Sequence, residues 1–387
     1  MEWKEVRLGD VCEIYGRIGF RGYTTNDLVD TPKEGAISLS PKNIINGELN
    51  LDQCTYIKWD KYYESPEIMI NPNEIIITKT GSSVGRTTFV RRVDYPMTLN
   101  PQLVVLKNIS ENAEFLSYYI KSALFQSVLK SIVVGSAIPT LSQKNLANLK
   151  INVPKEVDDQ RRIASILSSL DRKIELNNKI NADLEEMAQA IFKNWFVDFE
   201  PFKDGKFVDS ELGMIPEGWK VGCLGDLITI KYGKDHKKLD DGTFPVYGSG
   251  GLMRFVNSWL YNGESVLIPR KGTLDNIMYV CEKFWTVDTM FFSVPKMDYV
   301  MKYVYNYIKR FDFSKMNEGT SVPSNTAARL NKMPILIPTH EILEMYDETL
   351  CPIYNKRKMK DKESRILSLL RDTLLPRLMS GELEVPE

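Results

Sequence analysis

The sequence predicts an α+β protein with two similar β-rich domains and two long helices that pair as an antiparallel coiled coil. The segment WKEVRLGDVCEI, which begins at Trp3, returns as WKVGCLGDLITI at Trp219, so the chain contains an internal repeat. After each copy, apolar residues recur at alternating spacings of four and three, which is the spacing of a coiled-coil seam. Two seams of similar length in one chain most simply pair with each other.

These patterns divide the chain into five segments, of which the two β-rich copies are named the first head and the second head. The expected boundaries are 1–155 for the first head, 156–200 for a central helical segment, 201–218 for a linker rich in Gly, Pro and Asp, 219–340 for the second head and 341–387 for a C-terminal helical segment.

The two heads follow the same order from end to end. In each, the first strand leads into a tyrosine-glycine pair with basic residues behind it, at Tyr15 and at Tyr232. The stretch NEIIITKTG in the first head then corresponds to ESVLIPRKG in the second, an apolar strand that runs into a basic glycine turn. GSAIPTLSQKNLANLKINVP, ending at Pro154, matches GTSVPSNTAARLNKMPILIP, ending at Pro338, at one constant offset. Each head should therefore end in a short helix and a strand.

One glycine turn carries a pattern that is also found in hydrolases. Gly81, Ser83 and Gly85 spell G-x-S-x-G, which in a hydrolase places a nucleophilic serine between a strand and a helix. Here the turn is followed by RTTFV, a run typical of a second strand, and the other head lacks the pattern. Neither of the two histidines, His236 and His340, lies in a catalytic pattern. The sequence favours a glycine-rich hairpin.

The two helical seams have polar centres. In the central seam we expect Asn177 and Asn181 to fix the register of the helix pair. The alternative is that each helix packs only on its own head. Pro352 lies near the expected start of the second helix, where it either marks the first turn or breaks the segment. The seam positions are Ile163, Leu167, Leu170, Ile174, Asn177, Asn181, Leu184, Ala188, Ile191 and Trp195, and Tyr346, Leu350, Ile353, Arg357, Lys360, Ser364, Leu367, Arg371, Leu374 and Leu378.

The composition is that of an ordinary globular protein. The chain has 387 residues, a net charge of −1 and no apolar run of about 18 residues that could cross a bilayer, and its start has no apolar core of the signal-peptide kind, so we expect a cytoplasmic protein. The five cysteines are scattered without a C-x-x-C pair, so neither disulfides nor a metal site is expected. Residues 1–155 and 201–340 are slightly basic and the helical segments slightly acidic, which permits a nucleic-acid partner.

Two heads joined by long paired helices suggest a reader of two separated sites. A helix of about 40 residues is about 60 Å long, nearly two turns of B-DNA at about 34 to 36 Å per turn. Because the heads differ outside their shared strands and turns, the two half-sites should differ as well.

The chain resembles the specificity subunits of type I restriction-modification systems. The resemblance covers essentially the whole length and rests on IPTLSQKNLANLKINVP, IASILSSLDRKIELNNKINADLEEMAQAIFKNWFVDFEP, LGMIPEGW, FPVYGSGG and RDTLLPRLMSGE. It implies two target-recognition domains that read an asymmetric bipartite site in double-stranded DNA. It also implies helical regions that bind two methylation subunits, through which restriction subunits attach.

The resemblance further implies a chain without catalysis of its own, with S-adenosylmethionine, ATP and Mg²⁺ on the partner subunits. The nearest stretches to an N/D-P-P-Y/F methyltransferase motif are Asn71-Pro72-Asn73 and Asn100-Pro101-Gln102, and both lack the second proline and the aromatic residue. No G-x-x-x-x-G-K-[ST] phosphate loop is present in the sequence. The competing hypothesis is a two-headed protein scaffold that does not bind DNA.

The candidate DNA-binding residues are basic and polar groups on glycine turns and neighbouring loops, which suit phosphates and base edges. They are Lys79, Thr80, Ser82, Arg86, Arg17, Arg21, Tyr23, Ser136 and Thr140 in the first head, and Arg270, Lys271, Thr273, Lys234, His236, Lys237, Ser321 and Ser324 in the second. The candidate partner-binding residues are Phe192, Trp195 and Phe196. The alternative for these aromatic residues is burial against the second helix near Leu374 and Leu378.

Overall fold

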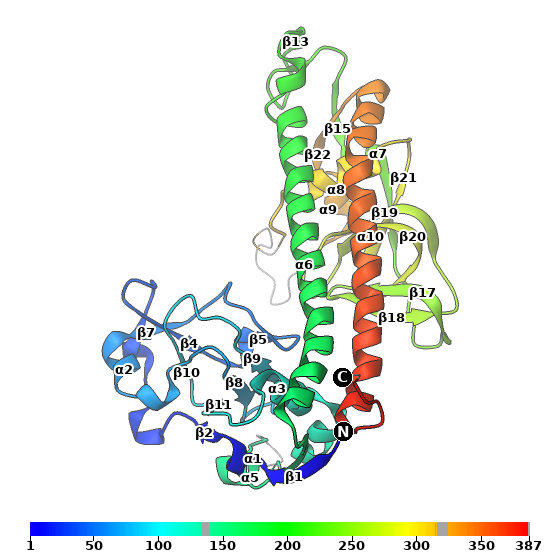
Figure 1. Cartoon of the computed structure of the whole chain (residues 1–387). Coiled ribbons are helices and arrows are strands. Elements are labelled where there is room, and N and C mark those ends of the chain that lie inside the picture. Colours follow the sequence, from blue (N-terminus) through cyan, green and yellow to red (C-terminus); the bar gives the residue numbers. More distant parts are fainter. Residues whose placement is uncertain (134–138, 314, 316–323, 386–387) are drawn as a thin grey trace. The chain divides into compact units, whose positions relative to one another are not determined.

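The computed structural model describes residues 1–133, 139–313, 315 and 324–385, and the chain forms two compact units. The first unit comprises Met1–Leu176 with Glu363–Glu387, and the second comprises Asn177–Lys362. Each unit contains one head and part of each long helix (Figure 1). The α+β class is confirmed. In the described part of the chain, no helix is long and apolar enough to span a membrane.

The first head is built from two small sheets that pack on short helices. One sheet has the order β10-β4-β7-β3, formed by Met97–Leu99, Gly35–Leu39, Tyr56–Lys58 and Leu28–Val29. The other has the order β2-β11-β8-β9, formed by Glu13–Tyr15, Leu103–Lys107, Ile75–Thr78 and Thr87–Phe89. The remaining elements are β1 (Trp3–Arg7) paired with β12 (Lys150–Pro154), β5 (Ile44–Ile45) paired with β6 (Glu48–Leu49), and α1 (Leu8–Val11), α2 (Trp59–Tyr63), α3 (Ala113–Lys121), α4 (Ala123–Ser131) and α5 (Gln143–Ala147).

The second head has one six-stranded sheet in place of two. Its order is β16-β21-β19-β20-β17-β18, formed by Ile228–Tyr232, Met290–Pro295, Tyr261–Pro269, Met278–Thr286, Asp241–Gly248 and Gly251–Val256. The remaining elements are β15 (Lys220–Cys223) paired with β22 (Pro334–Ile337), α7 (Leu224–Leu227), α8 (Met301–Ile308) and α9 (Ala327–Asn331). Before them, β13 (Phe207–Val208) and β14 (Ile215–Pro216) form a short hairpin in the expected linker.

The repeated L-G-D sequence has the same structural role in both heads. The Leu8 amide donates to the Leu149 carbonyl at 2.8 Å, and the Leu224 amide donates to the Met333 carbonyl at 2.9 Å. These bonds join the first helix of each head to the residues that follow its last short helix. The aspartate that follows accepts a backbone hydrogen bond from three residues earlier in each case. The sequence repeat is therefore a repeat of structure.

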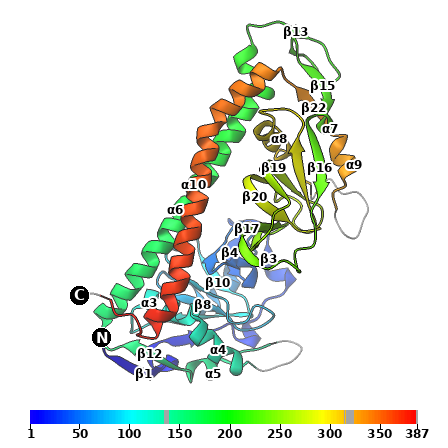
Figure 2. The same cartoon turned by 90° about the vertical axis from the view of Figure 1, so that its right-hand side faces the viewer.

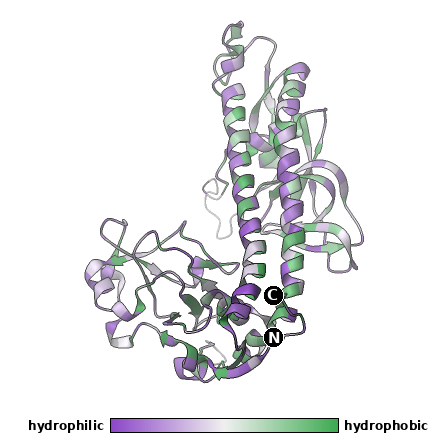
Figure 3. Cartoon of the chain, viewed as in Figure 1, coloured by the Kyte–Doolittle hydropathy of each residue, from purple (hydrophilic) through white to green (hydrophobic). Residues whose placement is uncertain are grey.

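The two long helices are α6 (Val157–Phe196) and α10 (His340–Met379), and they lie side by side in both views (Figures 1 and 2). Hydrophilic and hydrophobic residues alternate along both of them (Figure 3). Every predicted seam position in either helix is buried or half-buried. In the first unit the start of α6 meets the end of α10, through Asp171 and Arg371. In the second unit the end of α6 meets the first half of α10, through Glu185 and Arg357. The antiparallel pairing is confirmed.

Pro352 neither marks the first turn of α10 nor breaks it, so both predicted roles of this proline are wrong. The helix begins at His340, well before Pro352, and continues through the proline without a break. Pro352 is exposed on the solvent side of the helix. There, water can solvate the carbonyl group that the proline leaves without an intrahelical donor, so the helix tolerates the residue.

Candidate nucleic-acid interface

In both heads the glycine turn after a central strand lies beside the segment that leads into the last short helix. In the first head, Thr80 and Thr140 pair as a single antiparallel β-bridge, and the Leu141 amide donates to the Lys79 carbonyl at 2.8 Å. In the second head, Lys271 forms the same bridge with Ser324, and the Asn325 amide donates to the Arg270 carbonyl at 3.0 Å. Lys79 and Arg270 therefore occupy equivalent positions, as the repeat predicts.

The turn of the first head is a hairpin, and it has no helix behind it. β8 pairs antiparallel with β9. Gly81 and Gly85 in the turn have φ angles of 104° and 89°, which residues other than glycine rarely adopt. Ser83 lies in this turn, while both histidines belong to the other unit. The hairpin prediction is confirmed, and the hydrolase alternative has no support. Ser82 and Arg86 are exposed on the same turn.

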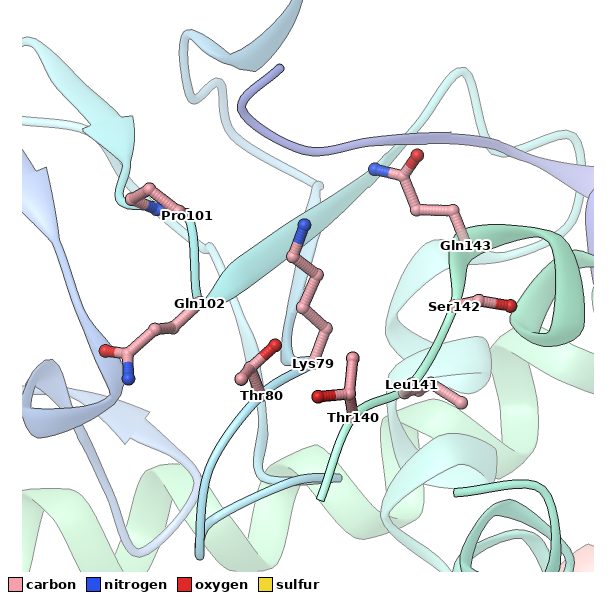
Figure 4. A pocket seen from close by; sticks show the side chains of 8 residues that line it. All are labelled: Lys79, Thr80, Pro101, Gln102, Thr140, Leu141, Ser142 and Gln143. Carbon is pink, nitrogen blue, oxygen red and sulfur yellow. The ribbon is translucent and has the colours of Figure 1, made fainter. Parts of the chain in front are cut away.

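Lys79 enters a pocket at this turn, which is seen from close by in Figure 4. Its side chain extends toward the middle of the pocket, where the amide of Gln143 also points, while Thr80 and Thr140 lie side by side below it. The lining residues are Lys79, Thr80, Pro101, Gln102, Thr140, Leu141, Ser142 and Gln143. The pocket combines a cation, three hydroxyl groups and two carboxamides, which are the groups that recognise phosphates and base edges.

Sequence reasoning missed Gln102 and Gln143. Both glutamines line the pocket, but neither is among the predicted site residues. The position of Gln102 is fixed by the strand pairing, because the Lys79 amide donates to the Gln102 carbonyl at 2.8 Å. Gln143 is the first residue of α5, whose N-cap is Ser142. Neither contact is visible in a local sequence pattern.

The charge of Lys79 is unusual for a half-buried side chain. Burial lowers the pKa of its ammonium group from the ordinary 10.5. Among the residues that the structure describes, no carboxylate pairs with it. By contrast, the half-buried Lys107 is paired with Glu74 at 2.9 Å, and the buried Lys302 is paired with Asp347 at 2.7 Å. Lys79 is therefore a cation with unused capacity for an anionic or acceptor ligand.

Arg270 has a similar environment in the second head. Its guanidinium lies over the Tyr232 ring, 5.6 Å from the centroid, and no acidic side chain in the described part of the chain pairs with it. A ring face attracts a cation without neutralising its charge. Lys271 and Thr273 are exposed on the same turn, where Gly272 has a φ angle of 86°.

Arg17 does not fit the prediction that it contacts DNA. It is only 4% exposed, and its guanidinium donates to the Leu99 carbonyl at 2.9 Å, to the Arg21 carbonyl at 3.2 Å and to the Thr98 hydroxyl at 3.2 Å. It also lies over the ring of Tyr23. A guanidinium that is occupied in this way orders its own loop, so Arg17 is a structural residue.

The other predicted loop residues are placed as follows. Arg21 forms a long ion pair with Glu67 at 3.5 Å, and the Tyr23 hydroxyl hydrogen-bonds to Ser38 at 2.9 Å. In the second head, Lys234 and Lys237 are exposed between β16 and β17, and His236 beside them is half-buried. Ser136 and Ser321 lie outside the described residues.

The predicted partner surface at the end of α6 is wrong. Phe192 and Phe196 are 1% and 4% exposed, and Trp195 is half-buried against the same core. The Phe196 ring lies 4.7 Å from Tyr303 of α8 and 4.8 Å from Tyr346 of α10. These aromatic residues fix α6 to the second head. The alternative of burial within the chain holds, but the contact is with the start of α10 because the helices are antiparallel.

Asn177 and Asn181 form the polar centre of the seam on α6. Asn177 is fully buried, and the Asn181 amide donates to the Asp361 carboxylate of α10 at 2.7 Å. An inter-helix hydrogen bond of this kind is formed in one register only.

Comparisons with known proteins agree with this architecture. A family model for the type I restriction modification DNA specificity domain matches residues 1–186 and again 216–360. The type I restriction enzyme MjaIX specificity subunit of Methanocaldococcus jannaschii is 26% identical over 426 residues, covering 100% of this chain and 94% of the relative. The HindI specificity subunit of Haemophilus influenzae is 22% identical over 470 residues, covering 99% and 100%.

A solved structure shares the fold. The type I restriction-modification S subunit from M. genitalium matches with a TM-score of 0.58 at 18% identity, over 97% of this chain and 96% of that one. The family model covers most of the chain in two copies, as the internal repeat requires. The chain therefore belongs to the type I restriction-modification DNA specificity family, and it is a non-catalytic subunit that recognises DNA sequence.

Proposed function

We propose that this chain reads an asymmetric, bipartite target in double-stranded DNA, with one half-site for each head. Its helices hold two methylation subunits, and restriction subunits attach through these. S-adenosylmethionine, ATP and Mg²⁺ bind to the partner subunits in this proposal. The heads are residues 1–155 and 219–340, separated by the helical segments 156–200 and 341–387 and the linker 201–218.

The observation that carries the proposal is the matched pair Lys79 and Arg270. Both are half-buried cations on a glycine turn, at equivalent positions of two heads, and neither has a carboxylate partner in the described part of the chain. Burying a cation without a counter-charge costs free energy, which a phosphate or a guanine edge recovers on binding. A scaffold that never meets DNA has no use for such a cation in either head.

Some of the surrounding polar groups suit contacts with DNA phosphates, which position the protein, and others suit contacts with bases, which read the sequence. Thr80, Thr140, Ser82 and Arg86 in the first head, and Lys271, Thr273 and Ser324 in the second, lie on or beside the turns and suit phosphate contacts. Gln102 and Gln143 have carboxamides, which can pair with adenine in two hydrogen bonds. Lys234, His236 and Lys237 belong to a neighbouring loop of the second head, and Arg21 and Tyr23 to one of the first.

The test is co-expression with a cognate methylation subunit, followed by mapping of N6-methyladenine by long-read sequencing of the host DNA. A two-part motif with a fixed unspecified spacer is the expected result, and exchange of residues 1–155 for another first head should change one half only. A stable complex that methylates no motif would favour the scaffold hypothesis.

Point variants then test the two cations. Lys79→Ala should weaken DNA binding by the assembled methyltransferase by roughly 1–3 kcal/mol and relax recognition in the half-site of the first head. Arg270→Ala should do the same for the other half-site. Lys130→Ala, which removes an exposed lysine of α4 in the first head, is the matched control and should leave both half-sites unchanged.

A further inference from the structure

Each head contacts the helix pair through a cluster of three residues: a tyrosine, an acidic residue and an arginine. In the first unit, the Tyr118 hydroxyl of α3 donates to the Asp171 carboxylate of α6 at 2.6 Å, and Arg371 of α10 donates to the other oxygen at 2.7 Å. In the second unit, the Tyr305 hydroxyl of α8 donates to the Glu185 carboxylate of α6 at 3.0 Å. Arg357 of α10 forms an ion pair with Glu185. We call these clusters the first and second triads.

Each triad joins three separate elements through one carboxylate. The tyrosine comes from the helix that follows the last strand of the main sheet, the carboxylate from α6 and the arginine from α10. The tyrosines are 3% and 2% exposed, and the carboxylate side chains are 15% and 20% exposed. The contacts are therefore shielded from solvent, and the three elements must meet in one geometry for all of them to form.

The two tyrosine hydroxyl groups of the triads are kept in the protonated form that donates hydrogen bonds. Burial, followed by the contact with Asp171, raises the pKa of Tyr118. Burial, followed by Glu185, raises the pKa of Tyr305. The raised pKa values favour the protonated hydroxyl groups, which are the form that donates.

The two triads have the same spacing on both helices. Asp171 and Glu185 are fourteen residues apart on α6, and Arg357 and Arg371 are fourteen residues apart on α10. Fourteen residues are two heptads, so both triads fall on the same stripe of each helix. The two contacts therefore share one spacing, with the carboxylate on α6 and the arginine on α10 in both.

Stability alone does not account for these clusters. A buried ion pair is often no more stabilising than an apolar contact of the same size, because both charges must leave water. What the shared carboxylate adds is direction: the arginine of α10 holds the carboxylate of α6 in place, and the hydrogen bond from the tyrosine is lost when the head rotates or slides on the helices.

We propose that the two triads are positioning residues that fix each head on the helix pair and thereby set how many base pairs may separate the two half-sites. The inference rests on the proposed bipartite function. The triads touch neither the glycine turns nor the pocket of Lys79, so they act on the spacer and not on the base sequence of either half-site.

The test uses the assembled methyltransferase and a set of DNA targets that share both half-sites but have spacers of the native length or one base pair shorter or longer. Tyr118→Phe removes a single hydroxyl from the first triad, and Tyr305→Phe removes one from the second. Each should lower the preference for the native spacer by about tenfold, the factor that one hydrogen bond to a charged group allows.

Each head offers a matched control. The Tyr119 hydroxyl accepts from the Asn152 amide at 3.1 Å, and the Tyr303 hydroxyl donates to the Leu336 carbonyl at 2.6 Å, so both are bonded within their heads. Tyr119→Phe and Tyr303→Phe should lower the melting temperature and leave the spacer preference as in the wild type. Equal spacer preference in the triad variants and the controls would overturn the inference.

The outcome is separable from that of the proposed function. If the wild-type complex methylates no two-part motif, the proposed function fails and the spacer test has no target. If the wild-type motif has a fixed spacer that Tyr118→Phe, Tyr305→Phe and the double variant all preserve, the positioning role alone is wrong. A double variant that accepts several spacers within unchanged half-sites would support it.

Discussion

The Asn181 amide of α6 donates a 2.7 Å hydrogen bond to the Asp361 carboxylate of α10. Ten residues before Asn181 on α6 stands Asp171, and its partner Arg371 stands ten residues after Asp361 on α10. Glu185 and Arg357 continue the same antiparallel register in the opposite direction. Apolar seams alone can slip by a heptad, so these polar pairs define the alignment of the helices.

Removal of the Asn181 side chain tests this register contact. Asn181→Ala in the assembled complex should lower the free energy of unfolding by about 0.5–1.5 kcal/mol, the typical net contribution of one hydrogen bond. Asn178→Ala, at an exposed position of the same helix, has the same change in helix propensity without the lost bond. Chemical denaturation of both variants gives the difference, and equal stabilities would mean that Asn181 does not define the register.

The sequence predicted those features that a local pattern can carry. The heptad spacing gave the seam and the antiparallel pair, and the repeat gave the equivalence of Lys79 and Arg270. The predictions for Arg17 and Phe196 failed because their surroundings come from distant parts of the chain. Arg17 is covered by Thr98 and Leu99 of β10, and Phe196 by Tyr303 of α8. Burial of this kind depends on tertiary packing, which no local pattern of residues reports.

The glycine of the first L-G-D sequence, Gly9, tests the close packing of α1 against α5. A Cβ atom added at Gly9 would lie 2.9 Å from the Ala147 Cβ and 3.1 Å from the Ala147 carbonyl oxygen, so α1 and α5 would have to separate. We expect Gly9→Ala to destabilise the protein by roughly 1–3 kcal/mol. Gly250→Ala is the control, because the space around its Cβ position is open. A thermal melt of each variant decides, and a Gly9→Ala protein as stable as the control would contradict the close contact.

Because Phe196 packs among aromatic rings at the end of α6, we expect truncation of its side chain to lower the stability of the protein strongly. Phe196→Ala leaves a cavity between Tyr303, Tyr346 and Trp219, with ring distances of 4.7, 4.8 and 5.6 Å in the native chain. The expected cost is about 3–5 kcal/mol. Met187→Ala, at a side chain of the same helix that is 52% exposed, should cost less than about 0.5 kcal/mol. If Phe196→Ala impaired binding of the methylation subunit without loss of stability, the aromatic surface would belong to the partner after all.

Pro352 predicts a gain in stability. In the interior of α10 it removes one backbone hydrogen bond, and its ring crowds the preceding turn. Pro352→Ala should raise the free energy of unfolding by about 1–3 kcal/mol, since both penalties disappear. Lys356→Ala, one turn further along the exposed face, should change it by less than about 0.5 kcal/mol. A destabilised Pro352→Ala protein would show that the helix needs the proline, for example to bend around the second head.

The lowered pKa of Lys79 predicts a pH dependence of DNA binding. Burial holds this pKa below 10.5 in the unbound protein, and a bound phosphate or guanine acceptor stabilises the charged form and raises it again. Between the two pKa values the bound complex holds one proton more than the unbound protein. Affinity for a cognate duplex should therefore fall as the pH rises through the unbound pKa, and proton uptake should accompany binding there.

The measurement is the dissociation constant of the assembled methyltransferase for its target as the pH rises from neutral toward the ordinary lysine value of 10.5. The salt concentration is held fixed, since screening also weakens phosphate contacts. Lys79→Arg should flatten the curve, because a guanidinium stays charged over this range. Lys130→Arg, at an exposed position of the same head, should leave the curve of the wild type unchanged. Should Lys79→Arg and the wild type lose affinity in parallel, the Lys79 ammonium does not contact DNA, and the titrating group must be sought on another side chain of the interface.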